Sequence, residues 1–118
     1  MKKKIAFIFP GQGAQYPRMG KDFADTFAVA KQTFEEADDQ LGRKLSSIIF
    51  NGPEDVLIET KNSQVGIYVT SVAILRTIHS LFPGFIPSIC AGLSLGEYTA
   101  LTASGRLDFT EGLSLVQH

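Results

Sequence analysis

Apolar positions along the chain predict two short strands separated by a long helical stretch. Residues 5–9 form a continuous apolar run that Pro10 and Gly11 end, which is typical of a strand buried on both faces of a parallel sheet. Residues 86–91 form a second run of small and apolar residues and predict a second strand. Because helical segments separate and follow the two strands, the pattern predicts an α/β fold with parallel strands.

The segment after the first strand shows helical periodicity. From Phe23 to Leu41 the apolar residues are spaced by alternating steps of four and three, which predicts one amphipathic helix over this range. Gly42 stands where a C-terminal glycine ends a helix. Residues 44–50 predict a further short amphipathic helix.

A longer helix precedes the second strand, and another closes the chain. We expect Asn62 or Ser63 to cap a helix that runs to about Leu81 and is apolar around most of its circumference. Such a helix is buried, so other elements must pack on both its sides. Asp108 and Glu111 match a capping box and predict the start of the last helix.

The domain organisation follows from the number of strands. Two strands cannot bury each other's edges and faces, and both runs read as buried strands. We therefore expect residues 1–118 to be the N-terminal portion of a single, larger α/β domain that this chain does not complete.

Composition excludes several classes of protein. The 118 residues are 44% hydrophobic and 19% charged, a globular balance, and the net charge of −1 offers no excess of basic residues for a nucleic acid. A single cysteine and two histidines provide neither a disulfide framework nor a four-ligand zinc site. The apolar run after the first lysines is too short for a signal peptide, and no run is long enough to span a membrane. We expect a cytoplasmic protein that binds no metal, nucleic acid or membrane.

Residues 92–96 read Gly-Leu-Ser-Leu-Gly and match the nucleophile elbow, Gly-x-Ser-x-Gly. In this motif the serine occupies a sharp strand-to-helix turn that exposes its hydroxyl, and the glycines remove side chains that would collide there. A strand before the motif and a helix predicted over 95–103 supply the required context. The motif predicts Ser94 as a nucleophile. The alternative is a helix cap, because Ser94 and Glu97 also match a capping box.

Residues 11–13 read Gly-Gln-Gly and follow the first strand. A dinucleotide-binding fingerprint would need glycine at position 16, which is Tyr16. The loop is therefore either a plain turn or a source of backbone N–H donors for a charged intermediate. In elbow enzymes the oxyanion hole combines the N–H after the nucleophile, here Leu95, with one from a loop after another strand.

Two segments together resemble a known family. Residues 9–15, Phe-Pro-Gly-Gln-Gly-Ala-Gln, and residues 91–98, Ala-Gly-Leu-Ser-Leu-Gly-Glu-Tyr, resemble the bacterial malonyl-CoA:acyl carrier protein transacylases of fatty-acid synthesis. Gln64 and residues 70–73 are similar to that family's buried helix, and the resemblance extends from residue 4 to residue 118. The motifs also occur in the acyltransferase domains of polyketide synthases.

The resemblance implies a hydrolase-like parallel-sheet acyltransferase domain, with a smaller ferredoxin-like subdomain that lies outside this chain. It implies that Ser94 is acylated, that the backbone N–H groups of Gln12 and Leu95 form the oxyanion hole, and that Gly11 and Leu93 border the substrate pocket. The family usually has histidine where this chain has Leu93.

The family's general-base histidine and carboxylate-binding arginine are expected beyond His118. We do not expect His79 or His118 to act as the base, and we expect Arg106 to serve a turn between helices.

The resulting hypothesis is transfer of a malonyl group from malonyl-CoA to acyl carrier protein through an acyl-serine. The partners would be the carrier protein and a coenzyme A thioester, with no further cofactor. The alternatives are a serine esterase or thioesterase, a polyketide-type acyltransferase domain, and a non-enzymatic fragment if the chain ends at His118.

Overall fold

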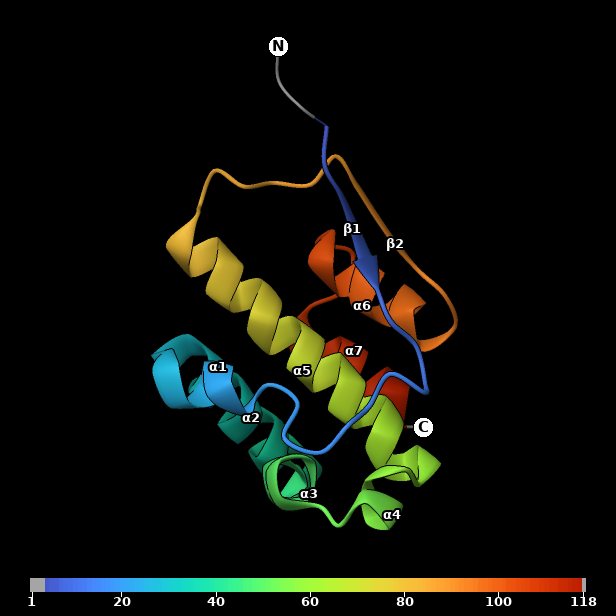
Figure 1. Ribbon diagram of the computed structural model, residues 1–118. Coiled ribbons are helices and arrows are strands. Elements are labelled where there is room, and N and C mark those ends of the chain that lie inside the picture. Colours follow the sequence, from blue (N-terminus) through green and yellow to red (C-terminus); the bar gives the residue numbers. More distant parts are fainter. Residues whose placement is uncertain (1–3, 118) are drawn as a thin grey trace.

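The computed structural model describes residues 4–117, which form two strands and seven helices (Figure 1). In chain order the elements are β1 (Ala6–Phe9), α1 (Lys21–Thr26), α2 (Ala28–Leu41), α3 (Leu45–Asn51), α4 (Glu54–Leu57), α5 (Thr60–Leu81), β2 (Ile89–Gly92), α6 (Leu95–Ala103) and α7 (Phe109–Gln117). The order strand, helices, strand, helices confirms the predicted α/β fold.

Helix α5 crosses the middle of the molecule and organises the core. Figure 1 shows α1 to α3 on one side of α5 and the strands with α6 on the other; α5 contacts α1, α2, α3, α4, α6 and α7. Its Tyr68 and Val69 are fully buried, as are Leu45 and Ile49 of α3 and Leu113 of α7. The prediction of a helix buried on most sides is confirmed.

The two strands pair in parallel, with Ala6 opposite Ile89 and Phe9 opposite Gly92. The prediction that they are buried on both faces is wrong for the described chain. Helix α6 contacts both strands, but the side chains of Ile8 and Ile89 are 79% and 63% exposed. The reason is that no element among residues 4–117 covers that face of the sheet.

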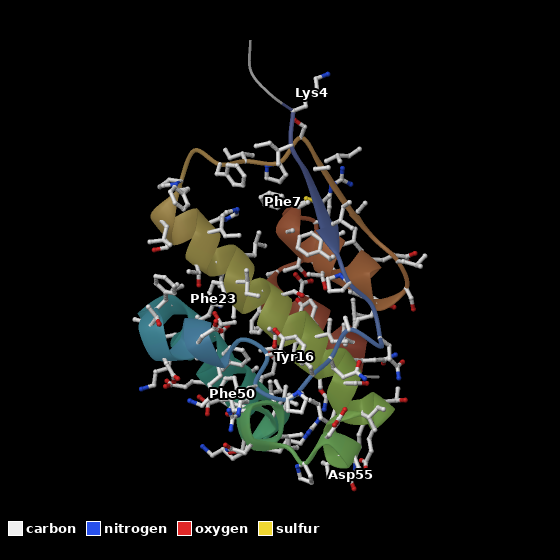
Figure 2. All side chains as sticks on the ribbon, viewed as in Figure 1. Lys4, Phe7, Tyr16, Phe23, Phe50 and Asp55 are labelled. Atoms are coloured by element: carbon white, nitrogen blue, oxygen red, sulfur yellow. The ribbon has the colours of Figure 1, made fainter. Side chains whose placement is uncertain are left out.

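An apolar cavity of about 480 Å³ lies beside β1, where α1 and α5 approach it. Phe7, Tyr16 and Phe23, which Figure 2 labels, contribute to its lining. Together with the exposed strand face, the cavity leaves the sheet side of the molecule less tightly packed than the helical core around α5.

The helix predicted from Phe23 to Leu41 is broken in two. Phe27 adopts an extended conformation, with φ −117° and ψ 123°, and it ends α1 and begins α2. Its N–H donates to the Phe23 carbonyl, and its own carbonyl accepts from Ala30 and Lys31. A single extended residue hardly disturbs the apolar spacing, so the periodicity did not show the break. Gly42 ends α2 in the left-handed conformation, as expected.

Two other boundaries differ from the prediction. Helix α5 begins at Thr60 rather than after a cap at Asn62 or Ser63, which lie buried within its first turn. Strand β2 begins at Ile89 rather than at residue 86; the chain turns at residues 82–85, where Phe85 N–H donates to the Phe82 carbonyl, and residues 86–88 lead from that turn into the strand. No helix formed by residues 4–117 has the length and apolar character needed to cross a membrane.

Candidate active site

Ser94 lies in the sharp turn that joins β2 to α6. Only Leu93 and Ser94 separate the last strand residue from the first helical residue. Ser94 has φ 55° and ψ −115°, a positive φ that residues other than glycine rarely adopt. The turn is held by two backbone hydrogen bonds of 3.0 Å, from Gly96 N–H to the Leu93 carbonyl and from Glu97 N–H to the Ser94 carbonyl. Such strained backbone persists where the surrounding structure enforces it, and it clusters at active sites.

The two glycines of the motif permit backbone contacts that a side chain would prevent. A Cβ at Gly92 would overlap the backbone of Gly96, and a Cβ at Gly96 would overlap the carbonyl of Phe9 at the end of β1. Both positions therefore require glycine for steric reasons. The result is that α6 begins directly against the carboxyl ends of both strands.

The Ser94 hydroxyl is not used as a helix cap. Ser94 is the N-cap residue of α6, but its side chain makes no cap hydrogen bond, so the capping-box alternative is wrong. Ser94 instead lines a hollow of about 380 Å³ between α5, α6 and α7. The other lining residues are Gln64, Leu95, Glu97, Tyr98, Leu115 and Val116.

The Gly-Gln-Gly loop approaches the elbow from β1. A Cβ at Gly11 would lie 2.9 Å from the Leu93 carbonyl oxygen and 4.0 Å from the Leu95 nitrogen, so the loop backbone passes close to the start of α6. The loop closes through Ala14 N–H donating to the Gly11 carbonyl at 3.2 Å. Within residues 4–117 neither the Gln12 nor the Leu95 N–H has a hydrogen-bond acceptor.

A strained, exposed serine at a sharp strand-to-helix turn is typical of enzymes that transfer acyl groups through a serine. A family model described as "Acyl transferase domain" matches residues 6–118. The chain belongs to the acyl transferase domain family.

Members of this family that are similar to the chain carry related names. The chain is 45% identical over 114 residues to the malonyl CoA-acyl carrier protein transacylase of Bacillus subtilis (strain 168), and the match covers 97% of this chain and 35% of that protein. The crystal structure of acyl-carrier-protein-S-malonyltransferase from Bartonella henselae matches with a TM-score of 0.93 and 43% identity, over 98% of this chain and 37% of that chain.

A third match is a structure of a type II PKS acyl-carrier protein in complex with its malonyl-transacylase. Its TM-score is 0.92 at 43% identity, and the match covers 98% of this chain and 37% of that one. The chain thus spans little more than a third of the length of these relatives.

The side chain of Gln12 makes contacts that sequence reasoning missed. Gln12 Nε2 donates to Thr60 Oγ1, and Gln64 Nε2 donates to Gln12 Oε1, each at 3.2 Å. The sequence indicates Gln64 only as part of a helix similar to that family's buried helix. Thr60 gave no such signal, although the four-residue spacing places Thr60 and Gln64 on one face of α5.

Other sequence candidates lie away from the hollow or at its edge. The side chain of Leu93 is 81% exposed, and neither Leu93 nor Gly11 is among the residues that line the hollow. His79 is exposed in the last turn of α5, 15 residues beyond Gln64, which corresponds to about 22 Å along a helix axis. Arg106 is exposed beyond the end of α6, and His118 lies outside the described residues.

Among the residues that the structure describes, no imidazole lies in the hollow beside Ser94 to act as a general base. Within residues 4–117 no three His, Cys, Asp or Glu side chains gather as they would around a metal ion. Cys90, on β2, has its pKa raised by burial. Its thiol is therefore protonated at neutral pH, and Cys90 acts as a small apolar residue of the strand.

Proposed function

We propose that this chain is the N-terminal part of a malonyl-CoA:acyl carrier protein transacylase of fatty-acid biosynthesis, and that Ser94 is its acylated nucleophile. The observation that carries the proposal is the strained backbone of Ser94 at the strand-to-helix turn, with its hydroxyl unused by the fold. The names of the relatives support malonyl-CoA and acyl carrier protein as the two substrates.

The proposed reaction has two halves. Ser94 Oγ attacks the thioester carbonyl of malonyl-CoA and loses its proton to a base, and the N–H groups of Gln12 and Leu95 stabilise the negative oxygen of the tetrahedral intermediate. The carbon–sulfur bond then breaks, and coenzyme A leaves as the thiol after taking up the proton. In the second half, the phosphopantetheine thiol of the carrier protein attacks the malonyl-serine ester and releases the serine hydroxyl.

A histidine base would have to come from outside the hollow that residues 4–117 form, because its described lining contains no imidazole. We propose that further polypeptide, such as the relatives possess, supplies it. The same polypeptide would cover the exposed face at Ile8 and Ile89 and the cavity beside β1. Residues 1–118 expressed alone should then show neither a cooperative unfolding transition as a monomer nor malonyl transfer. A sharp unfolding transition or normal turnover in that fragment would contradict the proposal that further polypeptide supplies the base and covers the exposed face.

The test of the nucleophile uses the full-length protein that carries this chain. Brief exposure to malonyl-CoA should add one malonyl group to the peptide that contains Ser94, as detected by mass spectrometry, and Ser94→Ala should abolish both the adduct and transfer. Ser104→Ala is the matched control, since Ser104 is an exposed serine at the other end of α6. An adduct on another residue, or full transfer by Ser94→Ala, would refute the proposal.

The same assay separates transfer from hydrolysis. With carrier protein present, a transacylase should deliver malonyl groups to the carrier thiol and release little free malonate. A serine esterase or thioesterase would release malonate at the same rate with or without the carrier. A non-enzymatic fragment would do neither.

A further inference from the structure

The side chain of Gln12 is held at both ends of its amide group by the start of α5. Its nitrogen donates to Thr60 Oγ1, and its oxygen accepts from Gln64 Nε2. Both distances, 3.2 Å, lie at the long end of the range for an N–H···O hydrogen bond. The partners lie 48 and 52 residues further along the chain, so the contact joins the loop after β1 to a different element.

The start of α5 is a firm anchor for this contact. Asn62, which is only 1% exposed, accepts from Arg43 Nη1 at 2.7 Å and donates from Nδ2 to the Val56 carbonyl at 2.9 Å. Its neighbour Ser63 is completely buried. The first turn of α5 is therefore tied to α4 and to the segment before α3, and it offers Gln12 a fixed pair of partners.

Apart from this side chain, the loop around Gln12 is closed by two bonds, Ala14 N–H to the Gly11 carbonyl at 3.2 Å and Gly13 N–H to Gln15 Oε1 at 2.7 Å, and neither involves the Gln12 N–H. Gly11 and Gly13 flank Gln12, and glycine allows its backbone far more conformations than other residues do. Gly13 has φ 107°, is exposed, and has no atom within 4 Å of the place where a Cβ would be. Since neither of those bonds involves Gln12 itself, the two contacts of its side chain add a constraint on the direction in which its N–H points.

We propose that Gln64 is a positioning residue for the transfer reaction. Together with Thr60 it holds the Gln12 side chain and thereby fixes the Gln12 N–H for the oxyanion. Gln64 is suited to this role because it also lines the hollow beside Ser94, so the contact forms at the edge of the reacting site. This inference rests on the proposed function.

Two substitutions of similar shape test the contact in the full-length protein. Gln64→Met removes the donor to Gln12, and Thr60→Val removes the acceptor. Each should lower kcat roughly 10- to 100-fold and leave KM for malonyl-CoA within about twofold, since a misplaced donor weakens the transition state more than substrate binding. If Gln64→Met does not fold, Thr60→Val tests the same amide from its other end.

Gln40→Met is the matched control. Gln40 Nε2 donates to the Thr110 carbonyl at 2.9 Å and to Ser114 Oγ at 3.0 Å, so it also joins two elements, α2 and α7, through a side-chain amide. Gln40→Met should lower the melting temperature about as much as Gln64→Met and leave kcat unchanged. A purely structural role of Gln64 would make the two variants behave alike.

A double-mutant cycle shows whether Gln64 acts through Gln12. In a Gln12→Ala background, Gln64→Met should cause no further loss of kcat, because the contact is already absent. If Ser94 is acylated but Gln64→Met has wild-type kcat, the positioning role is overturned. Losses of kcat that multiply in the double variant would overturn it as well. If the wild-type protein is not acylated at Ser94, the proposed function fails first, and the positioning role falls with it.

Discussion

The close approach of α6 to β1 at Gly96 provides a steric test of the proposed site. In Gly96→Ala, the new Cβ would overlap the Phe9 carbonyl and would have to move by about 1 Å to reach ordinary van der Waals distance. The atoms it meets are backbone atoms of Phe9 and Pro10, which cannot rotate away. The start of α6 must therefore move away from the end of β1.

This movement would separate the two proposed oxyanion donors. Leu95 precedes Gly96 and moves with α6, whereas Gln12 follows Pro10 and stays with β1. A displacement of about 1 Å between catalytic groups typically costs on the order of 100-fold in rate. The overlap itself should also destabilise the protein by about 1–3 kcal/mol, as overpacking usually does.

A graded series of glycine variants makes the measurement specific. In Gly11→Ala the new Cβ would lie 2.9 Å from the Leu93 carbonyl oxygen, a milder clash, whereas Gly84 has no atom within 4 Å of the added group. The rate of Ser94 malonylation, followed by rapid quench and mass spectrometry in the full-length protein, should fall most in Gly96→Ala, less in Gly11→Ala and not at all in Gly84→Ala. Wild-type acylation and melting temperature in Gly96→Ala would refute the steric argument.

Three further predictions concern the oxyanion loop, the last helix and the core. Gln12→Pro, which deletes the N–H, should reduce transfer more than Gln12→Ala, by on the order of a further 10-fold in kcat, and equal activities in the two folded variants would argue against a backbone donor. The N–H of Glu111, helped by a neighbouring hydroxyl, lowers the pKa of Asp108 below the ordinary aspartate value of about 3.9. The ionised Asp108 carboxylate therefore stabilises the fold above that pH, and this stability is lost as the pH falls through the lower folded-state pKa. In circular dichroism melts, Asp108→Asn should lower the melting temperature at pH 7 and make the melting temperature depend less on pH in the acid range. Gly112→Ala should lower the free energy of unfolding by about 2–3 kcal/mol in urea titrations, because the methyl group would overlap the Tyr68 hydroxyl in the core; an unchanged unfolding midpoint would show that this contact relaxes freely.

Features that depend on neighbouring residues were predictable from the sequence. Helix α6 has the predicted bounds of residues 95–103. The capping box of α7 forms as predicted, with Glu111 N–H donating to Asp108 Oδ1 at 2.8 Å. The sharp turn at Ser94 was predictable in part for the same reason, because glycine at position 92 relieves a clash with the backbone of Gly96, four residues on, whereas the clash that Gly96 avoids is with Phe9 of the distant β1.

Features that depend on distant packing were not predictable in the same way. The strands carry sequences suited to burial, yet whether their outer face is buried depends on whether a distant segment of polypeptide packs against it. The break at Phe27 could not be predicted from the spacing, since the helical period of apolar residues continues through it.

Most of the elements and the candidate nucleophile could be predicted from the residues alone, since helix periods, caps and glycine turns arise from hydrogen bonds and sterics within about four residues. The contact of the Gln12 amide with Thr60 and Gln64 is instead a product of folding. That contact exists because packing of α5 against its neighbours carries residues some 50 positions apart to the same edge of the hollow beside Ser94.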